Sequence, residues 1–179
     1  MRFEPTPLPG AFVIVPQPSH DARGFFARTF CEETFRAHGL DGRVVQCNLS
    51  FNQHRGTLRG LHFQAAPHGE AKLVTCIQGV VWDVIVDLRA NSPTLGRTFA
   101  AELRSSEHTM MYVPEGFAHG FQTLEDASAV FYQMSSAYQP TSARGIHWND
   151  PRLAIAWPIA TPIVSPRDDG LGAFPVEGI

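Results

Sequence analysis

One short segment of the chain concentrates side chains that could take part in chemistry. Residues 56–74 read GTLRGLHFQAAPHGEAKLV and carry Arg59, His62, His68, Glu70 and Lys72 within fourteen positions. The remaining residues of the segment are mostly apolar or β-branched, as in a buried strand. Three explanations fit this pattern: a metal site, an acid–base site, or a strand that reaches the surface here.

Two histidine motifs test the first explanation. The segment LRGLHFQ places His62 two residues before Gln64, and PEGFAH ends at His119. Together they resemble the two halves of the signature of cupins, jelly-roll proteins whose histidines point into the mouth of a barrel. A metal-binding cupin normally has a second histidine at the position of Gln64, and Glu70 lies slightly too far along the chain. Because a transition metal takes three or four ligands, we expect no metal here.

The cationic neighbours of His62 favour a different kind of site. Arg59 and Lys72 lie on strands otherwise made of Leu, Val and Ile, where a buried charge without an anionic partner is costly. A bound anion such as a phosphate would remove that cost. The pattern therefore predicts a pocket for an anionic small molecule, with a histidine at its working end. The alternative is that His62 and His119 are ordinary core histidines.

The elements that must position these residues are mostly strands. Alternating or β-branched runs, each bounded by turn-forming residues, cover residues 11–15, 43–51, 72–88, 98–103, 109–114, 120–124 and 129–135. Within residues 80–88, one face is entirely apolar and the other carries two aspartates. Residues 31–39 form the one convincing helical pattern, which ends at Gly39. We expect an all-β fold: a double-stranded β-helix or jelly-roll (cupin-like) barrel with one or few short helices, and residues 1–179 as a single domain.

The C-terminal segment has a different composition from about residue 150 onward. It is rich in proline and apolar residues and shows no strict alternation. Such a segment needs a surface to pack against if it is to be ordered. We therefore expect it to wrap around the barrel.

Bulk properties exclude several classes of function. The net charge is -3, and no basic run is present, so we expect no nucleic-acid and no membrane partner. Cys31, Cys47 and Cys76 are odd in number and widely spaced, which is typical of reduced thiols in a cytoplasmic protein. We find neither an apolar export signal nor an apolar stretch of membrane-spanning length.

Nine groups of residues, in order and with near-family spacing, resemble the dTDP-4-dehydrorhamnose 3,5-epimerase family of cupin-fold nucleotide-sugar epimerases. No single piece is specific, but together they extend over almost the entire chain. The pieces are DARGFF (21–26), QCNLS (46–50), LRGLHFQ (58–64), KLV (72–74), DVIVDLR with SPTLG (83–96), VPEGFAHGF (113–121), GIHWNDP (145–151), AWP (156–158) and SPRD (165–168).

The resemblance implies a substrate and a set of catalytic residues. The substrate class is a thymidine-diphosphate 4-keto-6-deoxyhexose, whose carbons 3 and 5 flank the ketone. Inverting either carbon requires a base on one face, an acid on the other and a group that stabilises the enolate oxygen. His62 corresponds to the base, Asp168 to its orienting partner, Lys72 to the enolate-stabilising cation and Tyr132 to the acid. No metal or organic cofactor is required.

The resemblance also implies a set of substrate-binding residues. A planar guanidinium can bind two phosphate oxygens at once, which suits arginine to a diphosphate. The implied positions are Arg23 and Arg59 at the diphosphate, Gln46 and Asn48 at the sugar or base, Tyr138 against the thymine ring, His119 in the sugar pocket, and Arg167 beside the catalytic aspartate. Structural alternatives exist for three residues: Arg23 as a turn residue, Tyr138 as a surface aromatic and Tyr132 as a core tyrosine.

At four positions the chain departs from the family pattern, so the resemblance does not determine which nucleotide-sugar the protein binds. The chain has Arg28 and Ala143 where relatives tend to have glutamate, and Gln133 and Arg167 where they tend to have lysine. The predicted catalytic set is unchanged. The open alternatives are another nucleotide, another keto-sugar, or an enzyme that epimerises only C3 or only C5. From other classes, a metal-dependent cupin enzyme and a sugar-nucleotide-binding module without chemistry also stay open.

The resemblance further implies a homodimer. Residues 11–15, AFVIV, would join the sheet of the partner by strand addition. Arg23 would then complete the partner's site.

Overall fold

Strands form most of the protein. A computed structural model describes residues 1–179. The elements are β1 (Arg2–Pro5), β2 (Phe12–Val15), β3 (Ser19–Asp21), β4 (Gly24–Phe26), α1 (Glu32–Ala37), β5 (Gln46–Asn52), β6 (Thr57–Gln64), β7 (Lys72–Gln78), β8 (Val80–Asp87), β9 (Thr98–Arg104), β10 (Met110–Val113), β11 (Phe117–Thr123), β12 (Ser128–Met134), β13 (Ala143–Gly145), β14 (Ile163–Val164) and α2 (Pro166–Asp169). No helix is long and apolar enough to cross a membrane.

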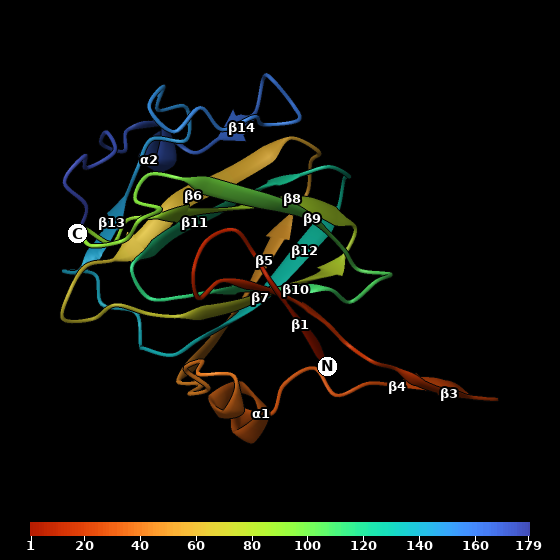
Figure 1. Cartoon of the computed structure of the whole chain (residues 1–179). Coiled ribbons are helices and arrows are strands. Elements are labelled where there is room, and N and C mark those ends of the chain that lie inside the picture. Colours follow the sequence, from red (N-terminus) through yellow and green to blue (C-terminus); the bar gives the residue numbers. More distant parts are fainter.

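Two sheets face each other and form the barrel (Figure 1). The first has the strand order β1-β2-β10-β7-β12-β5, and the second has the order β13-β6-β11-β8-β9, with β14 pairing with β6. The neighbours are antiparallel except for β14, which runs parallel to β6. The prediction of an all-β, cupin-like jelly roll with few short helices is therefore confirmed.

The main core lies between the two sheets, because each sheet turns one apolar face inward. Val74 and Val130 come from the first sheet, and Val81, Ile85 and Phe121 come from the second; all five are fully or almost fully buried. A second apolar cluster lies on the opposite face of the second sheet. There the C-terminal segment contributes Leu153 and Phe174.

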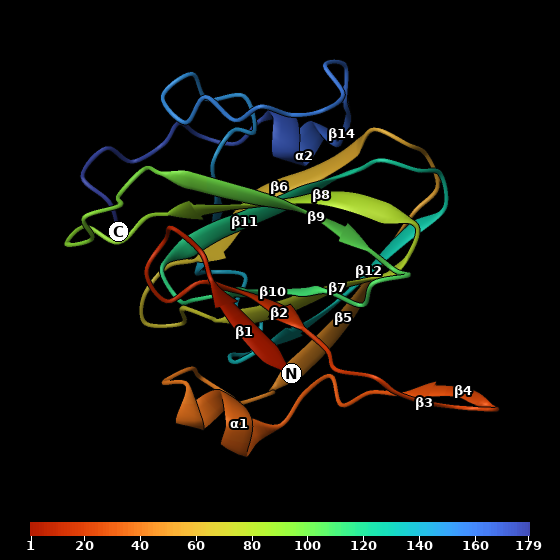
Figure 2. The same cartoon turned by 45° about the vertical axis from the view of Figure 1, so that its right-hand side comes forward.

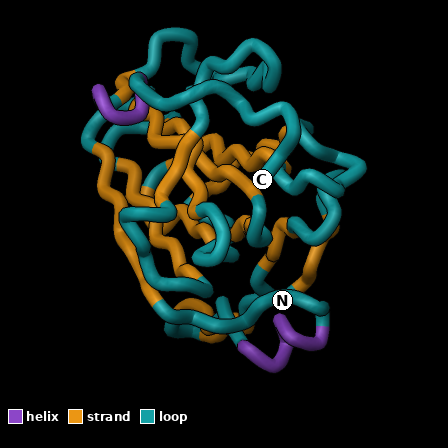
Figure 3. The backbone as a smooth tube through the Cα atoms, turned by 90° about the vertical axis from the view of Figure 1, so that its left-hand side faces the viewer, coloured by secondary structure: helices purple, strands orange, loops and turns teal.

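The C-terminal segment, blue in Figures 1 and 2, covers one end of the molecule, and α1 lies at the other end. The two helices accordingly lie at opposite ends of the backbone in Figure 3. Phe35 of α1 packs in a third cluster against β2, β7 and β10. The segment therefore wraps around the barrel, as its composition predicts. It also carries α2, which brings Asp168 back to β6.

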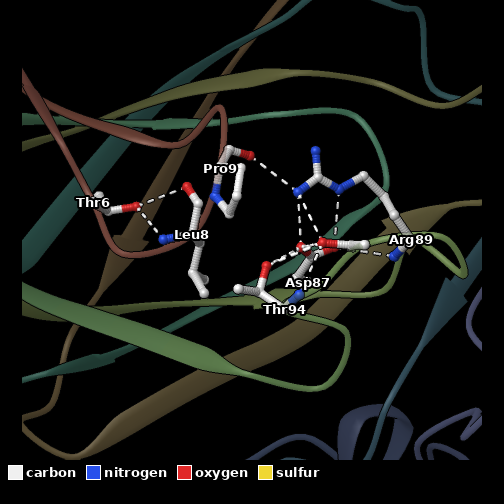
Figure 4. Close-up of polar contacts among 7 residues, drawn as sticks. Thr6, Leu8, Pro9, Asp87, Arg89 and Thr94 are labelled. Atoms are coloured by element: carbon white, nitrogen blue, oxygen red, sulfur yellow. Dashed lines mark hydrogen bonds and ion pairs between the residues drawn. The ribbon is translucent and has the colours of Figure 1, made fainter.

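Strand β8 ends in a polar network that joins it to the N-terminal loop. The Asp87 carboxylate accepts hydrogen bonds from Thr94 Oγ1 and Arg89 Nη2, each at 2.7 Å, and Arg89 Nη2 also donates to the carbonyl of Pro9 at 3.0 Å (Figure 4). The Asp87 side chain is fully buried. Its hydrogen bonds thus replace the water that the carboxylate loses on folding.

A hairpin of β3 and β4 projects away from the barrel in both views (Figures 1 and 2). Phe25 and Phe26 on this hairpin are largely exposed. Strand β2, by contrast, lies between β1 and β10 of its own sheet. The expectation that residues 11–15 join a partner's sheet is therefore wrong, because both edges of that strand are already paired. The unpaired edges of this sheet belong to β1 and β5.

Candidate active site

A cavity of about 610 Å³ opens between the two sheets, lined mainly by β5, β6, β7, β11 and β12. Side chains alternate along a strand, which places Tyr132 and Met134 of β12 together at its wall. Nine of the eleven predicted site residues line the cavity: Gln46, Asn48, Arg59, His62, Lys72, His119, Tyr132, Tyr138 and Arg167. Asp168 lies directly behind His62, whereas Arg23 lies elsewhere.

His62 and Asp168 form a hydrogen-bonded pair at one wall. His62 Nε2 lies 2.8 Å from Asp168 Oδ1, and the histidine side chain is 40% exposed, so a ligand can reach it. Burial raises the pKa of Asp168, but the hydrogen bond and charge of His62 and the hydrogen bond from Gly60 N outweigh it and lower that pKa. With Nε2 directed at the carboxylate, Nδ1 is the nitrogen that can accept a proton.

The backbone around Gly60 fixes the position of Asp168. Gly60 N donates to Asp168 Oδ2 at 3.1 Å, and Ser165 caps α2 by accepting from Asp168 N at 3.1 Å. Gly60 has φ +123°, and a Cβ there would lie 2.6 Å from Cα of Gly120. Glycine is therefore required where β6 passes β11.

A second histidine–carboxylate pair lies deeper in the cavity. His119 Nε2 is 2.7 Å from Asp83 Oδ2, and the Asp83 side chain is fully buried. The other carboxylate oxygen, Oδ1, has no hydrogen-bond partner. Sequence reasoning placed His119 at the pocket but missed Asp83. The available signal was an aspartate within the buried, otherwise apolar strand β8.

Lys72 has a partner that sequence reasoning left unassigned. Its Nζ lies 2.5 Å from Glu70 Oε1, and both side chains are almost completely buried. The argument that a bound anion must balance Lys72 is therefore wrong, because Glu70 already does so. Arg59 differs: its Nε donates to the neutral Asn52 Oδ1 at 2.7 Å, and it has no carboxylate partner. Arg59 remains free to meet an anion.

Tyr132 faces the cavity from the sheet opposite His62. It shares its side of β12 with Val130 and Met134, as the alternation predicts. Burial raises the pKa of its phenol; Arg59 lowers that pKa, and the charge of Glu70 raises it. The hydroxyl therefore keeps its proton at neutral pH and can serve as a proton donor.

Neutral polar groups line the outer part of the cavity. Gln46 donates from Nε2 to Asn48 Oδ1 at 3.0 Å, and its own Oε1 accepts from Tyr138 N at 2.9 Å. Tyr138 is 46% exposed at the mouth. An exposed aromatic ring beside amide groups suits a planar base.

Gln64, which occupies the position of a cupin's second histidine, bonds to backbone groups. Its amide nitrogen donates to the carbonyls of His68 and Ala137, and its oxygen accepts from Gln139 N at 2.6 Å. It thereby anchors the loop that carries Tyr138. No group of three or more His, Cys, Asp or Glu side chains is placed to hold a metal ion.

Arg23 does not reach the cavity within its own chain. It lies at the tip of the β3–β4 hairpin, where its guanidinium pairs with Asp21 at 2.6 Å and its side chain is 89% exposed. Among the departures, Ala143 and Arg167 line the cavity, but Arg28 and Gln133 do not. Arg144, which sequence reasoning did not single out, also lines it.

This arrangement can carry out proton transfer. A histidine oriented by a carboxylate lies on one wall, a protonated phenol on the opposite sheet, and an ammonium group nearby. Such a set can remove a proton from a carbon acid, stabilise the resulting anion and return a proton from the other side.

Comparison with known proteins agrees with this chemistry. The family model described as dTDP-4-dehydrorhamnose 3,5-epimerase matches residues 5–175. The chain is 42% identical to the dTDP-4-dehydrorhamnose 3,5-epimerase of Mycobacterium tuberculosis (strain ATCC 25618 / H37Rv), over 97% of this chain and 88% of the relative. It is 41% identical to the dTDP-4-dehydrorhamnose 3-epimerase of Streptomyces niveus, over 94% of this chain and 81% of the relative.

A solved structure shares the fold closely. The dTDP-4-dehydrorhamnose 3,5-epimerase of Bacillus anthracis, solved with TDP and PPi bound, superposes with a TM-score of 0.93 at 38% identity and covers 96% of this chain and 98% of its own. The chain therefore belongs to the dTDP-4-dehydrorhamnose 3,5-epimerase family and is an epimerase.

Proposed function

We propose that residues 1–179 act as a single domain that inverts C3 and C5 of dTDP-4-dehydro-6-deoxyglucose, which gives dTDP-4-dehydrorhamnose. The observation that carries this proposal is the His62–Asp168 pair, 2.8 Å apart, facing a cavity that Lys72 and Tyr132 also line. The product would serve synthesis of rhamnose or a related deoxysugar.

Each inversion is a proton removal followed by a proton return. His62 Nδ1 takes the proton from the carbon beside the ketone, and the C–H electron pair forms the enolate as the carbonyl π electrons move onto oxygen. Lys72 stabilises that oxygen. Tyr132 then gives its proton to the opposite face of the carbon, and the enolate collapses to the ketone. Solvent restores the two protonation states, so the net reaction changes only configuration.

Binding follows from the charges around the cavity. Arg59 and Arg167 line it and have no carboxylate partner, which suits them to a diphosphate. Gln46 and Asn48 contact the sugar or the base, Tyr138 stacks on the base, and His119 contacts the sugar.

A second candidate is an enzyme that inverts one carbon only. The Streptomyces niveus relative is named a 3-epimerase and is as similar to this chain as the double epimerases are. Ala143 at the cavity wall also leaves the sugar or nucleotide preference open.

Proton NMR of the keto-sugar nucleotide in D2O, with and without the protein, tests both candidates. Loss of the C3 and C5 signals together supports the double epimerase, and loss of one supports the single-centre enzyme. The His62→Ala variant should show neither. Binding of the nucleotide-sugar without exchange would contradict the proposal and favour a binding module. Activity that a chelator abolishes and a metal restores would favour a metal-dependent cupin.

We also propose that the enzyme is a homodimer in the cytoplasm. Leu49 and Phe51 of β5 are 63% and 56% exposed, and Ile77 of β7 is 51% exposed, so this sheet has uncovered apolar side chains. The projecting hairpin and the free edge of β5 suit contact with a second copy. Three unpaired cysteines agree with a reducing compartment.

A further inference from the structure

A buried ion pair lies in the wall of the cavity, and the proposed steps use only its basic member. Glu70 Oε1 lies 2.5 Å from Lys72 Nζ, and their side chains are 3% and 7% exposed. Removing both charges from water costs free energy that their attraction offsets only in good geometry. Glu70 is also the only carboxylate among the residues that line the cavity.

Both oxygens of Glu70 are engaged, and they connect two strands of the site. Oε2 accepts from the backbone N–H of Gln64 in β6 at 3.2 Å, while Oε1 contacts Lys72 at the start of β7. The only other contact of Lys72 Nζ is the carbonyl oxygen of His62, at 3.4 Å. Glu70 therefore determines where the ammonium lies relative to His62.

Glu70 also acts on Tyr132 through its charge. Burial is the largest cause that raises the pKa of the Tyr132 phenol, Arg59 opposes it, and Glu70 raises it further. The other titratable or charged groups that line the cavity are His62 of β6, Lys72 of β7, His119 of β11, Tyr138, Arg144 of β13 and Arg167 of α2. Asp168 and Asp83 lie behind the two histidines and are paired with them. Glu70 is therefore the only carboxylate that lines the cavity itself.

We propose that Glu70 is a positioning residue for the epimerisation. It holds the Lys72 ammonium beside the backbone carbonyl of His62, so that the ammonium can stabilise the enolate oxygen. This inference rests on the proposed function. Because the ammonium is already fixed before the reaction, it stabilises the new charge without reorganising. A role in stability alone would instead leave the pH dependence of catalysis unchanged.

The Glu70→Gln variant separates these two roles. Glutamine keeps the size of the side chain and can still accept from Gln64 N, but it removes the charge. We expect kcat to fall about 10- to 100-fold with KM changed by less than about threefold, as for loss of preorganised charge stabilisation. The alkaline limb of the kcat profile against pH should move to lower pH, because Tyr132 loses a charge that raises its pKa.

Ala71→Gly is the matched control. Ala71 lies between the two members of the pair and is 4% exposed, so the change perturbs local packing without altering charge. The control should leave the alkaline limb in place. The proposal would be overturned if Glu70→Gln left both kcat and the alkaline limb of its pH profile unchanged. It would also be overturned if both variants lost kcat equally and the alkaline limb did not move in either.

A measurement without substrate distinguishes this inference from the proposed function. Acetylation of Lys72 by dilute acetic anhydride near pH 8, followed by mass spectrometry, reports how firmly the ion pair holds the amine. We expect at least about tenfold faster modification in Glu70→Gln, because the amine is released from the carboxylate that engages it in the wild type. Equal rates would overturn the role of Glu70, whereas absence of proton exchange in the wild type would count against the proposed function alone.

Discussion

Single residues determine which protons the site can move, and Asp168 illustrates this most directly. Its carboxylate lies 2.8 Å from His62 Nε2 and is 7% exposed. Asp168→Asn should keep the shape of the site but reverse or weaken the hydrogen bond that orients the ring. We expect kcat to fall about 10²- to 10⁴-fold with little change in KM, the range for loss of a general base or its orienting partner.

The pKa of Asp168 gives this variant a second readout. Because that pKa is lowered in the folded protein, the stability it contributes is fully present above the ordinary aspartate value of about 3.9 and is lost as pH falls through the lower folded value. Thermal unfolding of wild type and Asp168→Asn across this acidic range should therefore converge. A constant difference in stability at every pH would contradict the assignment.

Tyr132 belongs to the same scale, because its role depends on one hydroxyl. In Tyr132→Phe, His62 can still remove a proton and return a deuteron to the same face in D2O. Inversion should fall by about 10²-fold or more, while deuterium still enters the unreacted sugar. NMR of the sugar separates the two events. Tyr138→Phe is the matched control, because it keeps a stacking ring at the mouth and should leave inversion intact; equal inversion by both variants would refute the role of Tyr132.

At the scale of elements, the Asp87 network holds the end of β8 against two loops. Asp87 is fully buried, and Arg89, Ser92 and Thr94 all donate to it. Asp87→Asn leaves Arg89 without its counter-charge, and we expect a loss of about 2–4 kcal/mol in the free energy of unfolding at neutral pH, near the cost of breaking a buried pair. Urea unfolding measures it.

The same network predicts an acid dependence. Burial raises the pKa of Asp87, but hydrogen bonds from Arg89, Ser92 and Thr94 lower it to about 2. The stability gained from this carboxylate is complete above about pH 3.9 and is lost as pH falls toward the folded value. Wild type should thus lose stability in this range more steeply than Asp87→Asn. Parallel pH curves for the two proteins would show that Asp87 contributes nothing through its charge.

At the scale of the whole molecule, the position of Arg23 decides whether a single chain can supply all the residues of one active site. Arg23 is at the tip of a hairpin outside its own cavity, so it can contact the diphosphate only in a partner's site. Arg23→Ala and His62→Ala homodimers should each have low activity. Mixing them should restore up to about one quarter of wild-type activity, because half of the dimers are mixed and half of their sites carry both groups.

Denaturation and refolding of the two variants together, followed by the exchange assay, measures this complementation. A double variant, Arg23→Ala with His62→Ala, mixed with His62→Ala is the control and should show no recovery. Full activity of Arg23→Ala alone, or no gain on mixing, would contradict a shared site. A monomer with full activity would contradict the dimer itself.

The sequence by itself determined the strands and most of the pocket. Period-two alternation decides which side chains of a strand share a face, so the order of residues alone places Tyr132 with Val130 and Met134. The residues of the dyad were indicated by the family resemblance, because the LRGLHFQ and SPRD segments that carry it are short runs of neighbouring residues.

The tertiary structure alone decided how these residues pair and which of them reach the pocket. Asp168 meets Gly60 across 108 positions of sequence, and the contact of His119 with Asp83 depends on the register of β11 against β8, in which Asp83 pairs with Phe121. Arg23 lies outside the cavity because its hairpin projects away from the barrel. Local patterns carry no information about such contacts, since these depend on where distant backbone segments pack.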